Sequence, residues 1–193
     1  MQPFGFFEKV RELKKLHRTG WVIKGVKAPE SIADHSFMLA VLAYAYSMEL
    51  RLDTDKCVKM ALMHDLCEAY SGDIPNRMRA KDKPMPDSAK RRLEEDGMKR
   101  MTSLLPEGPA GEMRKLWKEF LAGRSREARL VKDLDKLEMC MQALEYAKTA
   151  KAKARKKFAE FFEDGSLSIK TPHVRKAFVQ VYGEFKEIAE TNP

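Results

Sequence analysis

Long apolar runs are missing from this sequence. Its longest strongly apolar stretch extends from Phe37 to Tyr46, far short of the roughly 20 residues that a membrane-spanning helix needs. The first residues, MQPFGFFEKVRELKK, place charges after apolar residues and offer no small-residue cleavage site, the reverse of a secretory signal. We therefore expect a cytoplasmic protein with no membrane partner.

Cysteine is scarce as well. The three cysteines, Cys57, Cys67 and Cys140, form no CxxC pair, so a disulfide framework is not expected and the thiols should be reduced and mostly in the core. The net charge of +8 favours an anionic partner, which could be nucleic acid, a membrane surface or a phosphorylated small molecule. The basic run at 148–157 contains no aromatic residue, whereas nucleic-acid platforms usually interleave the two. We interpret the run as a solvated helix face and do not expect nucleic acid as a partner.

Strand patterns are also missing, because apolar residues recur at helical spacing along almost the whole chain. At 193 residues the chain has the size of one domain, so we expect a single all-α domain. Thr19-Gly20 should end the first helix, and Gly165 should separate the last two. The expected helices cover residues 4–16, 31–50, 54–70, 87–104, 109–122, 125–150, 151–163 and 172–190, with loops at 21–30 and 74–86.

Side chains that suit a metal ion interrupt three of these apolar helices. His64 and Asp65 lie within the run MALMHDLCEAYSGDIP, His35 lies in the first turn of the 31–50 helix, and Asp133 and Asp135 follow in the 125–150 helix. A lone His-Asp pair is weak evidence, since a core histidine or a capping aspartate looks the same. Three helices that each carry such a residue predict a site for a divalent transition metal (Mn, Co, Zn, Fe or Ni), with Mg less suited to imidazole ligands.

Four sequence blocks resemble, in order, those of the HD-domain phosphohydrolases, whose pattern is a His, an adjacent His-Asp and a distant Asp. They look closest to the 5'-deoxynucleotidase branch, which removes phosphate from deoxynucleoside 5'-monophosphates. The resemblance implies one HD-domain helical bundle of about seven to eight helices over 1–193, with 151–193 packed on it as a C-terminal helical extension, and it suggests a homodimer. The blocks are RTGW (18–21), PESIADHS (29–36), ALMHDLCEAYSGDIP (61–75) and LVKDLDKLEM (130–139).

The resemblance implies that His35, His64 and Asp65 are metal ligands and that the fourth lies in VKDLD. Asp133 and Asp135 both qualify there, but residues two apart on a helix point about 200° apart, so only one can face the metal. The apolar stripe of this helix is centred closer to Asp133, and periodicity alone leaves the choice open. The family motif aligns its ligand with Asp135, which we predict.

Glu68 and Asp73 match the acidic pair of the family. Glu68 lies four residues after His64, hence on the same helix face. Hydrolysis of a phosphomonoester needs a nucleophilic oxygen and charge stabilisation, which a divalent ion supplies. It also needs a proton for the leaving oxygen, which a carboxyl with a raised pKa can supply. We predict that Glu68 donates this proton and that Asp73 assists or binds the sugar, unless Asp73 is only a turn residue after Gly72.

Trp21 resembles the family's aromatic wall against the sugar, where packing at the ribose 2' position would favour deoxyribose, although a loop tryptophan can instead cover the core. A phosphate-binding arginine directly precedes this tryptophan in some members. In this sequence Gly20 directly precedes Trp21, and Arg18 lies two positions before Gly20. Arg18 is nevertheless our predicted phosphate ligand. Three other cations could replace it: Lys24, Arg77 and Arg79.

Two alternatives keep part of this interpretation. The same site could act on another nucleotide, namely a cyclic nucleotide, a nucleoside triphosphate or an alarmone, although the Gly-Asp turn and the RTGW block fit the monophosphatase branch better. The chain could also be a non-catalytic basic helical protein with a structural metal. In that case, replacing Glu68 would change no measurable activity.

Overall fold

The computed structural model describes residues 4–75 and 84–190 and is all-helical over these ranges, as predicted. Eight of its helices have seven or more residues, which confirms the expected seven to eight. The elements are α1 (Phe4–Glu12), α2 (Thr19–Ile23), α3 (Ile32–Glu49), α4 (Thr54–Met63), α5 (Glu68–Ser71), α6 (Asp87–Thr102), α7 (Glu107–Ala122), α8 (Arg126–Thr149), α9 (Ala152–Arg155), the 3₁₀ turn η2 (Lys156–Phe158), α10 (Ala159–Ser168) and α11 (Pro172–Glu190).

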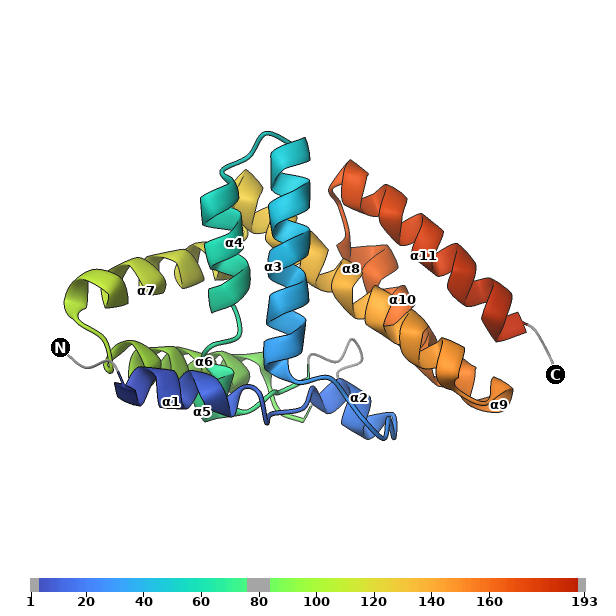
Figure 1. The fold of residues 1–193 in the computed structure, drawn as a ribbon, viewed down its shortest axis with the longest axis horizontal. Coiled ribbons are helices and arrows are strands. Elements are labelled where there is room, and N and C mark those ends of the chain that lie inside the picture. Colours follow the sequence, from blue (N-terminus) through green and yellow to red (C-terminus); the bar gives the residue numbers. More distant parts are fainter. Residues whose placement is uncertain (1–3, 76–83, 191–193) are drawn as a thin grey trace.

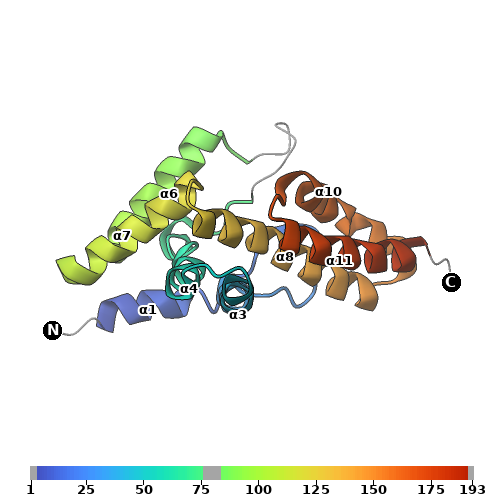
Figure 2. The ribbon, with the colours of Figure 1, turned by 90° about the horizontal axis from the view of Figure 1, so that it is seen from above.

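The long helix α8 organises the fold. The α3–α4 pair packs against α8 at the centre of the molecule (Figure 1). Seen from above, α6 and α7 lie on one side, α10 and α11 lie on the other, and α8 runs between the two groups (Figure 2). Helices α1 and α11 therefore lie at opposite ends of the molecule, and residues from both groups can meet at the middle of α8.

Two hydrophobic clusters hold these helices together. The larger is built on the buried face of α8 and includes Met60 and Ala61 at the end of α4. The smaller joins α1, α5, α6 and α7 and includes Leu66 and Cys67. The turn at 64–67 is therefore anchored in both clusters, because apolar burial on either side of it fixes its path.

The start of the chain differs from the sequence prediction. Helix α1 ends at Glu12, and Thr19 begins α2 instead of ending the first helix. The intervening residues pair with the segment before α3, since the N–H of Ile32 donates to the carbonyl of Leu16 at 2.9 Å. The N–H of Thr19 donates to Asp73, which supplies the partner that a helix start needs.

The prediction of one helix over 54–70 is also wrong, because the structure has two helices in this range. Helix α4 ends at Met63 and α5 begins at Glu68. At the break, the indole of Trp117 donates to the carbonyl of His64 at 3.1 Å, and the His64 ring bonds the carbonyl of Ala61. These contacts replace helical hydrogen bonds and turn the chain.

Gly165 lies inside α10 and separates no helices, contrary to the prediction. A Cβ at this position would lie 2.8 Å from Sγ of Cys140 and 2.8 Å from Cε2 of Phe178. The glycine is thus required for the close approach of α10 to α8 and α11. Whether 151–193 forms a separable extension stays a prediction, and within the described residues this region packs closely on α8.

The cysteines fit their prediction, since all three are free and buried. None of the described helices combines the length and the apolar character that crossing a bilayer requires.

Candidate metal centre

Four side chains from three parts of the chain converge beside α8. Nε2 of His35, at the start of α3, lies 3.2 Å from Nε2 of His64 and 3.2 Å from Oδ1 of Asp135 on α8. Potential ligand atoms of these three residues all lie within 4.8 Å of one another. Asp65 adds Oδ2, 2.9 Å from Nε2 of His64. These residues, which we name the His-Asp cluster, are the four predicted from the sequence.

Local structure orients each histidine. A capping box between Ser31 and Asp34 begins α3 and places His35 in its first turn. Nδ1 of His35 lies 2.5 Å from Oε2 of Glu138, and Nδ1 of His64 lies 2.7 Å from the carbonyl oxygen of Ala61. Both partners accept hydrogen bonds, so each neutral ring carries its proton on Nδ1 and directs the Nε2 lone pair into the cluster. Two facing lone pairs flanked by carboxylates fit a shared divalent cation.

The electrostatics of the cluster keep its carboxylates ionised. Burial alone would raise the pKa of Asp65, but His64 and Arg18 lower it to about 2. The pKa of Asp135 also lies well below its usual range despite burial, because Lys136 and His35 stabilise the charge. Burial and Arg18 oppose protonation of His35, yet Glu138 and Asp135 raise its pKa to about 9. The pocket thus attracts positive charge, as a metal site with ionised carboxylate ligands must.

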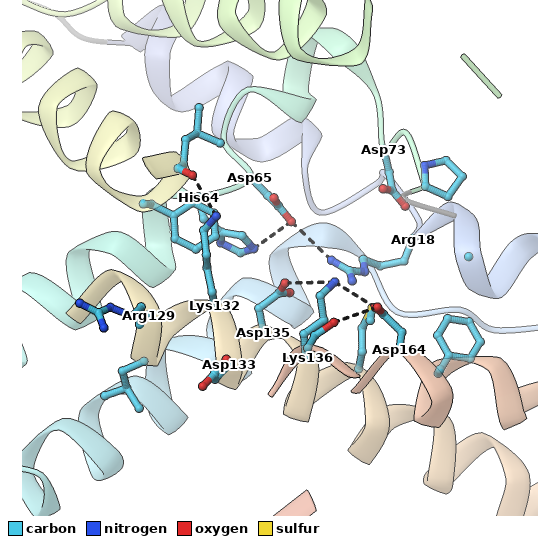
Figure 3. Close-up of a pocket in the computed structure, with 18 of the residues that line it drawn as sticks. Arg18, His64, Asp65, Asp73, Arg129, Lys132, Asp133, Asp135, Lys136 and Asp164 are labelled. Carbon is cyan, nitrogen blue, oxygen red and sulfur yellow. Dashed lines mark hydrogen bonds and ion pairs between the residues drawn. The ribbon is translucent and has the colours of Figure 1, made fainter. Parts of the chain in front are cut away.

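Asp133 points to a different place from Asp135. Its Oδ2 accepts from the backbone N–H groups of Lys170 at 3.0 Å and Thr171 at 2.6 Å. It lies apart from the ion pairs of Asp65 with Arg18 and of Asp135 with Lys136 (Figure 3). Asp133 therefore fastens the segment before α11, and the geometry favours Asp135 as the fourth ligand.

Glu68 begins α5 next to the cluster and is 6% exposed. Its Oε2 has no hydrogen-bond partner in the described part of the chain. Burial, together with the negative charges of Asp65 and Asp73, raises its pKa well above the usual range. A carboxyl in such an environment holds its proton to higher pH than a free carboxyl and can donate it.

Asp73 follows Gly72, whose φ of 70° places it in the left-handed region that favours glycine. One carboxylate oxygen of Asp73 accepts from the N–H of Thr19, and its carbonyl accepts from the Thr19 hydroxyl at 2.8 Å. Asp73 thus holds the start of α2 against the segment after α5, which fixes the neighbouring residue Arg18.

Arg18 reaches the cluster although its spacing from the tryptophan is unusual. Its Nη1 lies 3.4 Å from Oδ2 of Asp65, and its Nε lies 4.0 Å from Oε1 of Glu30. Burial opposes its charge, but the carboxylates around it, Asp65 first, raise its pKa above the ordinary value. A permanent cation therefore borders the cluster.

Trp21 is 1% exposed and belongs to the core. Its ring centroid lies 4.3 Å from that of Phe161, and its indole N–H donates to Glu30 at 2.7 Å. It borders the same cavity as the cluster, so its contact with a sugar stays a prediction beside its evident packing role.

Comparison with known proteins identifies the family. The HD-domain profile matches residues 10–176. The chain belongs to the HD-domain family. Its sequence is 37% identical over 187 residues to human 5'-deoxynucleotidase HDDC2, covering 97% of this chain and 86% of the human one. A conserved hypothetical protein from Pyrococcus furiosus, 30% identical, superposes with a TM-score of 0.69 over 93% of this chain and 98% of its own. The resemblance found in the sequence is thereby confirmed.

In this HD-domain protein the cluster opens into a cavity of about 1330 Å³. Arg18, His64, Asp65, Glu68, Asp73 and Asp135 all line it. Of the alternative phosphate ligands, Lys24 also lines it but pairs with Glu160 at 2.9 Å. Arg77 and Arg79 lie outside the described residues. Further cations border the cavity: Lys90, Arg129, Lys132, Lys136, Lys157 and Lys170.

The sequence reasoning missed two kinds of residue at this HD site. Glu138 could have been found, because it lies three residues after Asp135 on the same helix. Glu30, whose pKa burial and Glu138 raise to about 7, and Asp164, which lies 3.4 Å from Nζ of Lys136, carry no local signal. Only the packing of α3, with the segment before it, and of α10 against α8 brings them to the site.

Proposed function

We propose that this protein is a metal-dependent 5'-deoxynucleotidase that hydrolyses deoxynucleoside 5'-monophosphates to a deoxynucleoside and phosphate. The observation that carries the proposal is the position of Glu68, a buried carboxyl with a raised pKa, beside the His-Asp cluster. A proton donor next to a metal site is what a phosphomonoesterase requires. The relative named 5'-deoxynucleotidase, which this chain matches over nearly its whole length, supplies the substrate class.

His35, His64, Asp65 and Asp135 would hold the divalent ion. Two imidazoles and two carboxylates suit Mn, Co, Zn, Fe or Ni better than Mg. When bound, such an ion stabilises negative charge on the phosphoryl group and lowers the pKa of water.

Arg18 binds the phosphate oxygens through its guanidinium, which can offer two parallel N–H donors to one phosphate. Water attacks phosphorus and releases one proton to solvent, the bond from phosphorus to the 5'-oxygen breaks, and Glu68 gives its proton to the departing 5'-oxygen. Glu68 then regains a proton from solvent through the open cavity. Asp73 keeps Arg18 in place through Thr19, and its second carboxylate oxygen is available to the sugar. Packing of the sugar against Trp21 favours substrates that lack a 2'-hydroxyl.

The molecule would act in the cytoplasm, as a homodimer, on a small nucleotide and not on nucleic acid or a membrane. These points rest on the family resemblance and on the sequence composition. An HD site that acts on a cyclic nucleotide, a nucleoside triphosphate or an alarmone is the alternative that the same experiment addresses.

The test is phosphate release from a panel of deoxy- and ribonucleotides, after chelation and addition of Mn, Co, Zn or Mg one at a time. We expect release from deoxynucleoside 5'-monophosphates with a transition metal, and slower release from the ribonucleotides. Release from none of the deoxynucleoside monophosphates with any metal would refute the proposal. A Glu68→Gln variant with full activity would refute the assigned proton donor.

A further inference from the structure

Lys136 presents a second cation to the cavity that Arg18 also lines. Its Nζ lies 3.8 Å from Oδ2 of Asp135 and 3.4 Å from Oδ2 of Asp164. In the close-up, its ammonium and the Arg18 guanidinium point toward the same space, which Asp65, Asp135 and Asp164 surround (Figure 3). The positive charges of Arg18 and Lys136 oppose one another, so an anion between them would relieve their repulsion.

The contacts of Lys136 leave it able to bind a ligand. An ammonium has three N–H donors, and the two carboxylates near it lie at distances longer than a normal hydrogen bond. Asp164 is itself held by the Ser168 hydroxyl at 3.0 Å. It therefore keeps the long side chain of Lys136 directed into the cavity, at 22% exposure, instead of letting it extend into solvent.

The balance of charge calls for two cations at this place. Histidines that bind a metal through Nε2 are neutral, so the two negative charges of Asp65 and Asp135 would match a divalent ion. A phosphomonoester adds nearly two more near neutral pH. Arg18 supplies one positive charge beside Asp65, and Lys136 supplies a second, which it shares with Asp135 and Asp164.

We propose that Lys136 is a second phosphate-binding residue of this site, with Asp164 as the residue that positions its ammonium. This inference rests on the proposed function, because the phosphate is that of the nucleotide. When the phosphate enters, the Lys136 ammonium turns from Asp135 toward a phosphate oxygen while Asp164 continues to hold it. The phosphate is then bound between the guanidinium of Arg18, just before α2, and an ammonium from α8.

The test compares Lys136→Met with Lys148→Met, which removes the same charge from an exposed part of the same helix. Binding of inorganic phosphate and of deoxyadenosine to the Mn-loaded proteins is measured by calorimetry. We expect Lys136→Met to weaken phosphate binding about tenfold or more, since the lost hydrogen bond is charge-assisted. In Lys136→Met the affinities for deoxyadenosine and for Mn should not fall. Lys148→Met should match the wild type in all three affinities. Equal phosphate affinity in both variants, or an equal loss for deoxyadenosine, would overturn the proposal.

Two further measurements decide the matter if Lys136→Met does not fold. In the wild type, saturating inorganic phosphate should slow amine-reactive labelling of Lys136 at least fivefold, with Lys148 as the unprotected reference. Asp164→Asn removes the carboxylate that directs the Lys136 ammonium into the cavity, so its phosphate affinity should fall below that of the wild type. Unchanged labelling, or wild-type phosphate affinity in Asp164→Asn, would contradict the assignment. Because phosphate binding is measured without turnover, failure of the nucleotidase assay would count against the proposed function alone.

Discussion

Nδ1 of His35 lies 2.5 Å from Oε2 of Glu138, and the two side chains are 0% and 3% exposed. A carboxylate at this position fixes the ring orientation and tautomer and makes the other nitrogen a stronger ligand. The pair therefore connects the packing of α3 on α8 to the affinity of the cluster for a metal ion.

Glu138→Gln should weaken the binding of the metal about 10- to 100-fold, the usual effect of losing the carboxylate behind a histidine ligand. The amide keeps the shape of the side chain but removes its charge. The dissociation constant for Mn, measured by competition with a chelator, checks this. Glu145→Gln is the matched control, because Glu145 lies on the same helix and is 62% exposed. Equal affinities in the two variants would show that Glu138 is merely buried.

The two aspartates of VKDLD should respond in opposite ways to the same substitution. Asp135→Asn is expected to abolish stoichiometric metal binding with little loss of stability. Asp133→Asn should keep the metal but lower the free energy of unfolding by about 1–3 kcal/mol, because Asp133 accepts from the N–H groups of Lys170 and Thr171. Metal content and urea denaturation of both proteins decide the point. Metal loss in Asp133→Asn alone would reverse the assignment.

Much of this site could be predicted from sequence because its residues come in short blocks. His64 and Asp65 are adjacent, and the structure brings His35 and Asp135 to them, although their role as ligands stays a prediction. What could not be predicted depends on distant partners. The break after α4 requires Trp117 from α7, which lies 53 residues away from His64. The start of α2 requires Asp73, 54 residues after Thr19. Helical periodicity identifies the buried face of a single helix and carries no information about contacts between residues far apart in the sequence.

Gly165 and Gly183 should respond oppositely to alanine. At Gly165 a Cβ would lie 2.8 Å from Cys140, so overpacking should destabilise the fold by about 1–3 kcal/mol. At Gly183, inside α11, a Cβ would have nothing within 4 Å. There the better helix propensity of alanine should stabilise by about 0.5–1 kcal/mol. Thermal unfolding of the two variants tests the reason given for the glycine in α10, and a stabilised Gly165→Ala protein would contradict it.

Glu68→Gln should separate activity from stability. The variant loses the proposed proton donor, so kcat should fall about 10²–10⁴-fold while the metal is retained. In the wild type, kcat should decline at high pH as Glu68 loses its proton, and the variant should lack this decline.

In the metal-free protein, Glu68→Gln should raise the stability although it lowers the activity. Burial, with Asp65 and Asp73, raises the folded pKa of Glu68 above its unfolded value. Its contribution to stability is therefore fully present below the unfolded pKa and is lost as pH rises through the folded pKa. Glutamine carries no such penalty, so the Tm of the chelated variant should exceed that of the wild type at pH 8 and approach it toward pH 4. A variant less stable than the wild type at pH 8 would mean that Glu68 is ionised and paired in the folded protein.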